Sequence, residues 1–162
     1  MENFHLNAVE GWIELGNYDE AAEELHRCPP AIKSTVDSLK LWVRIYGAQN
    51  HWREVEMICE TLAKHAPEDP FTIFNQAEAF FKQGRAREAY AVFNYSPLCF
   101  RKGPKYFYAL ARYLCALDQK TLALTCLGNA FDKDPSLKLK ALNDPDLENV
   151  WSDVWDDQRY SS

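Results

Sequence analysis

Large apolar side chains recur along the chain at intervals of 34 residues. The first such set is Trp12, Tyr46, Phe80 and Leu114, and a second set follows nine residues later with Ala21, Val55, Ala89 and Ala123. Between these positions the apolar residues are spaced three or four apart, which indicates amphipathic helices, and no stretch alternates as a strand would. Self-similarity at a fixed period of this length predicts an array of helical hairpins.

The residues expected to separate the two helices of each hairpin keep the same period. They are Gly16, Asn50, Gly84 and Asp118. Glycine, asparagine and aspartate are the residue types that best tolerate a left-handed backbone at the end of a helix. We therefore expect a helix-to-helix turn at each of the four positions.

Prolines and capping residues indicate where the helices begin and end. Asp69-Pro70 and Gly103-Pro104 place proline at or near the first helical position of the third and fourth units. The stretch 34–37 (STVD) resembles a capping box that opens the second unit. Pro29 and Pro97 lie four residues before the usual closing position, so the second helices of units one and three should end about one turn early.

These features resemble the tetratricopeptide repeat, a 34-residue hairpin with a turn glycine, a small residue five positions later and a closing proline. The stretches ELGNYDEAAEEL (14–25) and FFKQGRAREAYAVF (80–93) carry the resemblance most clearly. The repeats fall at about 2–35, 36–69, 70–103 and 104–137. The resemblance implies an all-α, right-handed α-solenoid of four tetratricopeptide-like hairpins, arranged as a single domain over residues 1–162.

The segment after the fourth repeat, at about 138–156, is expected to form a C-terminal capping helix. Asp144 is suited to cap that helix and Pro145 to its first position. An apolar stripe at helical spacing follows: Leu147, Val150, Trp151 and Val154. Because the last repeat of a solenoid exposes an apolar face unless something covers it, this stripe predicts the cover. The stretch LKALNDPDLENVW (139–151) is also similar to the ending of uncharacterised bacterial tetratricopeptide proteins.

Composition excludes several classes of function. The net charge of −6, with scattered basic residues, argues against nucleic acid as a partner. No run of 18 apolar residues exists, so no membrane span is expected. The stretch 1–12 lacks the charged start and apolar core of a signal peptide. Five cysteines occur singly and never as CxxC, which predicts a reduced, cytoplasmic protein.

The sequence offers no arrangement suited to catalysis or metal binding. Its four histidines lie far apart and pair with no cysteine or carboxylate at metal-ligand spacing. It contains no phosphate-binding glycine loop and no nucleophile elbow. We therefore expect no enzyme activity, no cofactor and no metal site.

The resemblance also implies a binding surface, because the first helix of each tetratricopeptide repeat lines a concave groove. Carried over by phase, the residues expected to bind a peptide are Lys40, Arg44, Phe71, Phe74, Asn75, Phe81, Lys105, Tyr108 and Arg112. The same groove positions also hold Asn3, Leu6, Glu10, Asp37 and Glu78. Aromatic side chains flanked by cations favour an extended or helical peptide with acidic groups.

A sharper subset is implied by the chaperone-binding members of the family, which hold a C-terminal carboxylate with five residues. Those places map onto Lys40, Arg44, Asn75, Lys105 and Ala109. Arg44 replaces an asparagine and Ala109 replaces a basic residue, while the other three match the usual residue type. The alternative interpretation is that these charged side chains are simply solvated on exposed helix faces.

Taken together, the sequence predicts a non-catalytic protein–protein interaction module that binds a peptide or protein segment in its groove. Two alternatives stay open. One is a dedicated chaperone or assembly factor for a specific client protein. The other is a structural protein that self-associates, as a homodimer, through apolar residues such as Phe4, Leu6 or Trp155.

Overall fold

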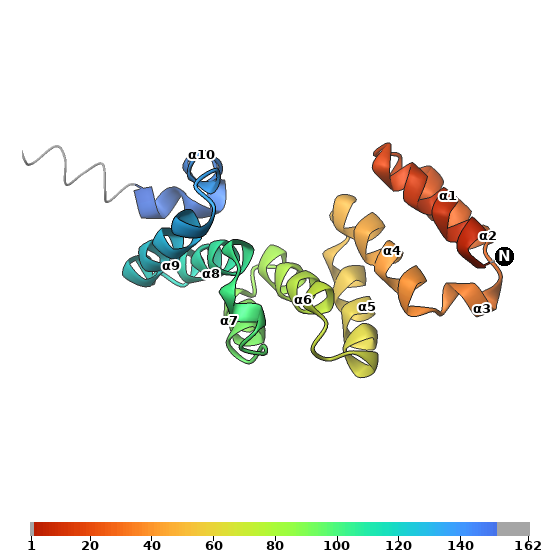
Figure 1. Ribbon diagram of the computed structural model, residues 1–162, viewed down its shortest axis with the longest axis horizontal. Helices are drawn as coiled ribbons and strands as arrows, with labels where there is room; N and C mark the ends of the chain where they lie inside the picture. The colour runs from red at the N-terminus through yellow and green to blue at the C-terminus, as the bar shows by residue number, and fades with distance from the viewer. Residues whose placement is uncertain (1, 152–162) are drawn as a thin grey trace, which may run out of the picture. The chain divides into compact units, whose positions relative to one another are not determined.

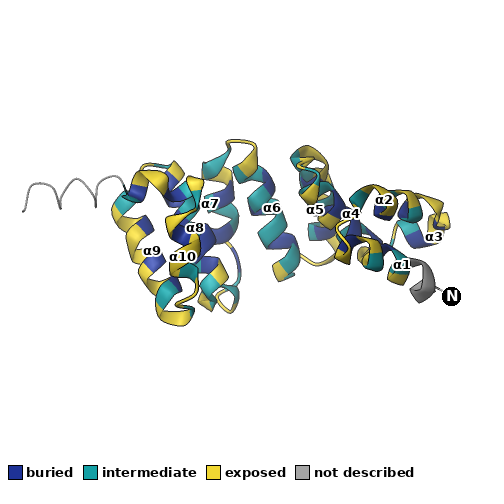
Figure 2. Cartoon of the chain, turned by 90° about the horizontal axis from the view of Figure 1, so that it is seen from above, coloured by how far each residue is buried: buried dark blue, intermediate teal, exposed yellow. Residues whose placement is uncertain are grey.

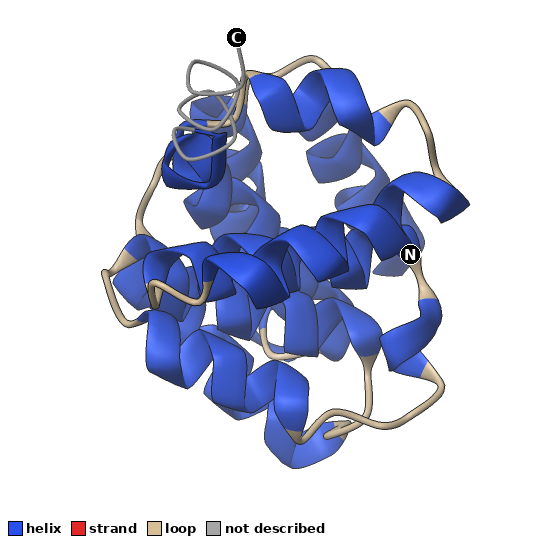
Figure 3. Cartoon of the chain, turned by 90° about the vertical axis from the view of Figure 1, so that its left-hand side faces the viewer, coloured by secondary structure: helices blue, strands red, loops and turns tan. Residues whose placement is uncertain are grey.

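A computed structural model of the chain describes residues 2–151, with side chains described for 6–151. Every regular element in the described range is a helix (Figure 3). The all-α class expected from the sequence is therefore confirmed. The chain divides into two compact units, Met1–Gln83 and Gly84–Ser162. The single domain expected from the sequence stays a prediction.

The first unit consists of two helical hairpins and the helix that follows them (Figure 1). Its elements are α1 (Glu2–Glu14), α2 (Tyr18–Arg27), α3 (Pro30–Lys33), α4 (Val36–Ala48), α5 (Trp52–His65) and α6 (Pro70–Lys82). Helix α1 packs against α2, α4 packs against α5, and α6 packs on α5. The buried residues of α4 and α5 lie on the sides where these two helices meet (Figure 2).

The second unit begins at the turn of the third predicted repeat, so that repeat's first helix, α6, belongs to unit one and its second helix to unit two. The elements of the second unit are α7 (Ala86–Asn94), η1 (Phe100–Lys102), α8 (Pro104–Ala116), α9 (Lys120–Lys133), α10 (Leu137–Leu142) and η2 (Pro145–Leu147). Helix α8 packs against both α7 and α9, and η2 packs on α8.

All four expected turn residues adopt the left-handed conformation. Their φ angles are +72° at Gly16, +61° at Asn50, +77° at Gly84 and +59° at Asp118. The residue after the turn closes it by donating its N–H to a carbonyl five residues back. This bond runs from Asn17 to Trp12, from His51 to Tyr46 and from Gln119 to Leu114, at 2.8–2.9 Å. The recurrent large residues therefore supply the acceptors that end their helices.

The small residues of the repeat lie where two helices approach most closely. Ala21, Val55, Ala89 and Ala123 are all 0% exposed. The early helix ends expected from Pro29 and Pro97 are also confirmed, since α2 has 10 residues and α7 has 9, while α5 and α9 have 14 each. Their shortness follows from the steric clash of proline with a preceding helical turn.

Capping differs from the expectation at one helix. The N-cap of α4 is Thr35, whose hydroxyl accepts from the N–H of Ser38, one residue later than the predicted box. The hydroxyl of Thr35 also donates to the carbonyl of Ile32 at the end of α3, which holds it in place. Proline follows the N-cap of α6 and of α8, as expected.

The C-terminal segment covers the last hairpin of the second unit. Asp144 caps η2 by accepting from the N–H of Asp146, and residues 148–151 continue as α-helix. Leu147 and Val150 are 0% and 1% exposed within the core cluster of α8 and α9, and the indole N–H of Trp151 donates to the carbonyl of Ala141 at 3.0 Å. The predicted cover is thus present over its described residues; Val154 lies outside them.

The turns should tolerate only residues that adopt positive φ. We expect Asn50→Val to lower the free energy of unfolding by about 1–2 kcal/mol, because a β-branched side chain clashes in this conformation. Asn50→Gly should change it by less than about 0.5 kcal/mol, since glycine adopts this φ without strain. Urea unfolding followed by circular dichroism measures both. Equal stabilities for the two variants would contradict the strain argument.

Candidate functional site

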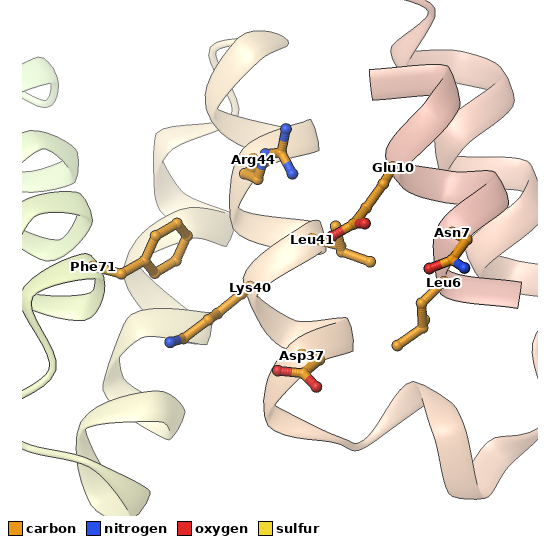
Figure 4. A pocket seen from close by; sticks show the side chains of 8 residues that line it. All are labelled: Leu6, Asn7, Glu10, Asp37, Lys40, Leu41, Arg44 and Phe71. Carbon is orange, nitrogen blue, oxygen red and sulfur yellow. The ribbon is translucent and has the colours of Figure 1, made fainter. Parts of the chain in front are cut away.

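A pocket of about 400 Å³ lies in the first unit and is lined by three helices (Figure 4). These helices are α1, α4 and α6, which are the first helices of the first three predicted repeats. The lining residues are Leu6, Asn7, Glu10, Asp37, Lys40, Leu41, Arg44 and Phe71. The volume falls within the range of about 300–1,000 Å³ that is usual for ligand pockets. We call it the α1–α4–α6 pocket.

Six of the eight lining residues occupy the groove positions expected from the repeat phase. The two that the sequence did not single out are Asn7 and Leu41. They lie 34 residues apart and share the phase of Asn75, which was selected. Extending that phase backwards by one and two repeats would have identified both.

The floor of the pocket is apolar. Leu41 is 4% exposed and belongs to the core cluster of the first hairpins. Leu6 is half-buried against the same cluster, and Phe71 is half-buried against the neighbouring cluster around Val55. Leu41 stands between the side chains from α1 and the ring of Phe71 (Figure 4). Such a floor can accept an apolar side chain of a bound segment.

Lys40 already has a carboxylate partner within the fold. Its Nζ lies 3.1 Å from Oδ2 of Asp69 and 5.4 Å from the centre of the Phe71 ring. The same oxygen of Asp69 caps α6 by accepting from the N–H and the hydroxyl of Thr72, at 3.3 and 2.9 Å. Burial opposes ionisation of Asp69, but the bonds from Thr72 and Lys40 outweigh it and lower its pKa. Lys40 therefore ties α4 to the start of α6.

The other charged side chains of the pocket are exposed. Arg44 on α4, Glu10 on α1 and Asp37 in the first turn of α4 form no ion pair within the part of the chain whose side chains are described. The pocket thus presents one cation and two carboxylates without partners in the fold, next to an apolar floor.

The remaining predicted residues of α6 do not line the pocket. Phe74 and Phe81 are half-buried, and Nζ of Lys82 lies 5.9 Å from the Phe81 ring centre. The side-chain amide of Asn75 donates to the carbonyl of Phe71 at 2.8 Å, one turn back on the same helix.

In the second unit, Tyr108 and Arg112 face the C-terminal segment of their own chain. The hydroxyl of Tyr108 donates to Oδ2 of Asp144 at 2.7 Å, and burial together with this bond raises the pKa of Tyr108. The guanidinium of Arg112 donates to Oδ2 of Asp146 at 3.0 and 2.6 Å. These side chains, expected from the sequence to contact a peptide, instead hold the cap.

The two remaining positions of the implied carboxylate clamp also lie in the second unit. Lys105 is exposed at the start of α8, and Ala109 is 7% exposed in the same helix, where it offers no donor.

One architectural contact recurs in the two units. Tyr108 lies 68 residues, or two repeats, after Lys40. Each of these two side chains binds the capping aspartate of the next helix, Asp69 before Pro70 and Asp144 before Pro145. The C-terminal segment therefore packs on α8 as the first helix of a following repeat would. This repetition gives Lys40 and Tyr108 a shared role in joining consecutive repeats.

The ion pair at Asp69 should make stability depend on pH. Because its pKa is lowered in the folded state, its contribution is present above the ordinary aspartate pKa of about 3.9 and is lost as the pH falls. We expect Asp69→Asn to cost about 1 kcal/mol at pH 7, since the pair is partly solvated. The difference from the parent should shrink towards zero near pH 2.5. Urea unfolding at both pH values checks this, and a constant difference would contradict it.

Two further searches bear on the chemistry of the site. Among residues 2–151, no helix is long and apolar enough to cross a membrane. In the same range, no group of three histidine, cysteine, aspartate or glutamate side chains is placed to hold a metal ion.

Comparison with known proteins gives one match. The model of a family described as "Anaphase-promoting complex, cyclosome, subunit 3" matches residues 48–130, which are 83 of the 162 residues. The match runs from the end of α4 to α9 and includes three of the four left-handed turns. No curated protein matches the chain. The similarity to bacterial proteins expected from the sequence stays a prediction.

Proposed function

Because the chain belongs to the anaphase-promoting complex, cyclosome, subunit 3 family, whose repeats are of the tetratricopeptide type, we propose that it is a protein–protein interaction module that binds a partner segment in the α1–α4–α6 pocket. Repeat arrays of this kind offer extended surfaces for binding. The family name denotes a subunit of a protein complex, so the proposed partner is another protein. A non-catalytic role is part of the proposal.

The observation that carries this proposal is the convergence of repeat positions on one pocket. Side chains from three successive first helices, separated by 34-residue steps in the sequence, line a single cavity with an apolar floor and a charged rim. An apolar centre ringed by polar groups is the usual anatomy of a protein-binding site. Phe71 supplies the aromatic anchor of the kind that dominates binding energy in such sites.

The proposed surface continues along α6 through Phe74, Asn75 and Phe81. Two half-buried aromatic rings there leave part of their apolar surface open to a partner. Lys105, exposed at the start of α8, is a further proposed contact. Tyr108 and Arg112 contribute through the cap that they hold.

Blocking the mouth of the pocket tests the function. The full chain is used to capture its partner from the source lysate, and Asn7→Trp is compared with the parent. Asn7 is exposed and lines the pocket, so an indole there fills the opening without entering the core. We expect partner capture to fall about tenfold or more, which corresponds to the loss of one strong contact.

The matched control is Glu60→Trp, which adds the same ring to an exposed position on α5 away from the pocket. It should capture the partner as the parent does. Equal capture by parent, Asn7→Trp and control would move the interface to another face of the protein. A dedicated chaperone would yield one client in stoichiometric amount, while a self-associating protein would yield only further copies of the chain.

A further inference from the structure

We propose that the segment bound in the α1–α4–α6 pocket carries basic and apolar side chains. The inference rests on the proposed function of this pocket and names the chemistry of its partner. It reverses the acidic preference that the sequence favours. Three observations carry it: the charge of the first unit, the partners of its cations and the composition of the pocket.

The charge of the chain is divided unevenly between the two units. Residues 1–83 hold 14 acidic and 7 basic side chains, a formal net charge of −7. Residues 84–162 hold the other 10 acidic and 11 basic side chains, a net charge of +1. The pocket therefore lies in a unit whose field attracts cations and repels anions. A field of this kind raises the local concentration and the association rate of oppositely charged partners.

The cations on which the acidic preference depends are mostly engaged. The ammonium of Lys40 is neutralised by Asp69 at 3.1 Å, and that carboxylate is fixed by its capping bonds to α6. The guanidinium of Arg112 is held by Asp146. An acidic ligand would have to displace a carboxylate already bound at either side chain. In the first-unit pocket this leaves Arg44 as the cation with no ion pair among the described residues.

The carboxylates of the pocket outnumber that cation. Glu10 and Asp37 are exposed, line the pocket from α1 and α4, and form no ion pair with any described side chain. In Figure 4 they stand above and below Leu41, at the mouth of the cavity. A lysine or arginine of the bound segment can reach either carboxylate, while a neighbouring leucine-sized side chain covers Leu41 and Phe71. Burying the apolar side chain lowers the local dielectric and strengthens such a charge pair.

Two labelled dodecapeptides test the sign of the charge directly. They share the same leucine positions, and one carries lysine where the other carries glutamate. Fluorescence anisotropy with the full chain measures both affinities. We expect the lysine peptide to bind about tenfold tighter at low salt, and this preference to shrink when salt shortens the screening length to about 8 Å.

Variants separate the pocket from the general field of the unit. Glu10→Gln combined with Asp37→Asn should reduce the preference to about twofold or less, because the local carboxylates are gone. Glu54→Gln combined with Glu60→Gln makes the same change in net charge on exposed positions of α5 and should keep most of the preference. Arg44→Gln should tighten binding of the lysine peptide, whereas an acidic occupant would be weakened by the same change.

The outcomes separate this inference from the proposed function. Tighter binding of the glutamate peptide, if abolished by Asn7→Trp, would overturn the basic preference and leave the pocket as the binding site. An equal loss of preference in the α5 variant and the pocket variant would overturn the assignment to Glu10 and Asp37. Peptide affinities that ignore Asn7→Trp altogether would contradict the binding site itself, and with it both proposals.

Discussion

Replacing Phe93 with alanine is expected to lower the free energy of unfolding by about 3–5 kcal/mol. Phe93 lies on α7 and is 0% exposed. Its ring stacks on Tyr106 at 5.1 Å and meets Tyr113 and Phe100 edge-on at 5.2 and 5.5 Å. Each such pair adds about 0.5–1.5 kcal/mol beyond the burial of area, so the loss should lie in the upper part of the usual range.

The matched control is Tyr95→Ala, two residues further along the chain. Tyr95 is 85% exposed, so its removal should change stability by less than about 0.5 kcal/mol. Urea unfolding followed by circular dichroism measures both variants. A loss below about 1 kcal/mol for Phe93→Ala would contradict its place at the centre of this aromatic cluster.

Leu147→Ala should cost about 2–5 kcal/mol, because it removes a fully buried side chain of the C-terminal cover. The side chain belongs to a core cluster shared with α8 and α9, and the ion pair of Arg112 with Asp146 lies beside it in the sequence. A loosened cover would also expose the apolar face of the last hairpin. We therefore expect the variant to associate at concentrations where the parent does not.

Leu139→Ala provides the control for the cover. Leu139 lies on the short helix α10 and is 71% exposed, so the same change there should be nearly silent. Thermal unfolding and light scattering at several concentrations test both variants. Equal behaviour of the two leucine variants would show that the segment is an appendage and not a part of the last hairpin.

The sequence predicts the backbone plan well because its determinants are local and repeated. Left-handed φ at Gly16 or Asn50 depends on one residue type and on its distance from the preceding helix. Small residues such as Ala21 mark close helix contacts for a steric reason that one position already expresses. Pro29 ends a helix early by its own ring. Each of these effects appears in the sequence at its own position.

The binding surface is only partly predictable because it depends on what each charged side chain meets in the fold. The repeat phase places Lys40 on the groove side, but its pairing with Asp69 requires the position of the next helix. Tyr108 follows the same rule with Asp144, a partner 36 residues away. The acidic preference inferred from the cations does not take these partners into account. Only the three-dimensional arrangement shows which charges remain open.

Amide hydrogen exchange of the full chain, alone and bound to its captured partner, tests the central claim most directly. If the α1–α4–α6 pocket binds the partner, exchange should slow in residues 2–14, 36–48 and 70–82, the helices that line it. Exchange in α5 and α9 should stay unchanged. Slowed exchange confined to α5, or to the helices of the second unit, would contradict the assignment of the binding site to this pocket.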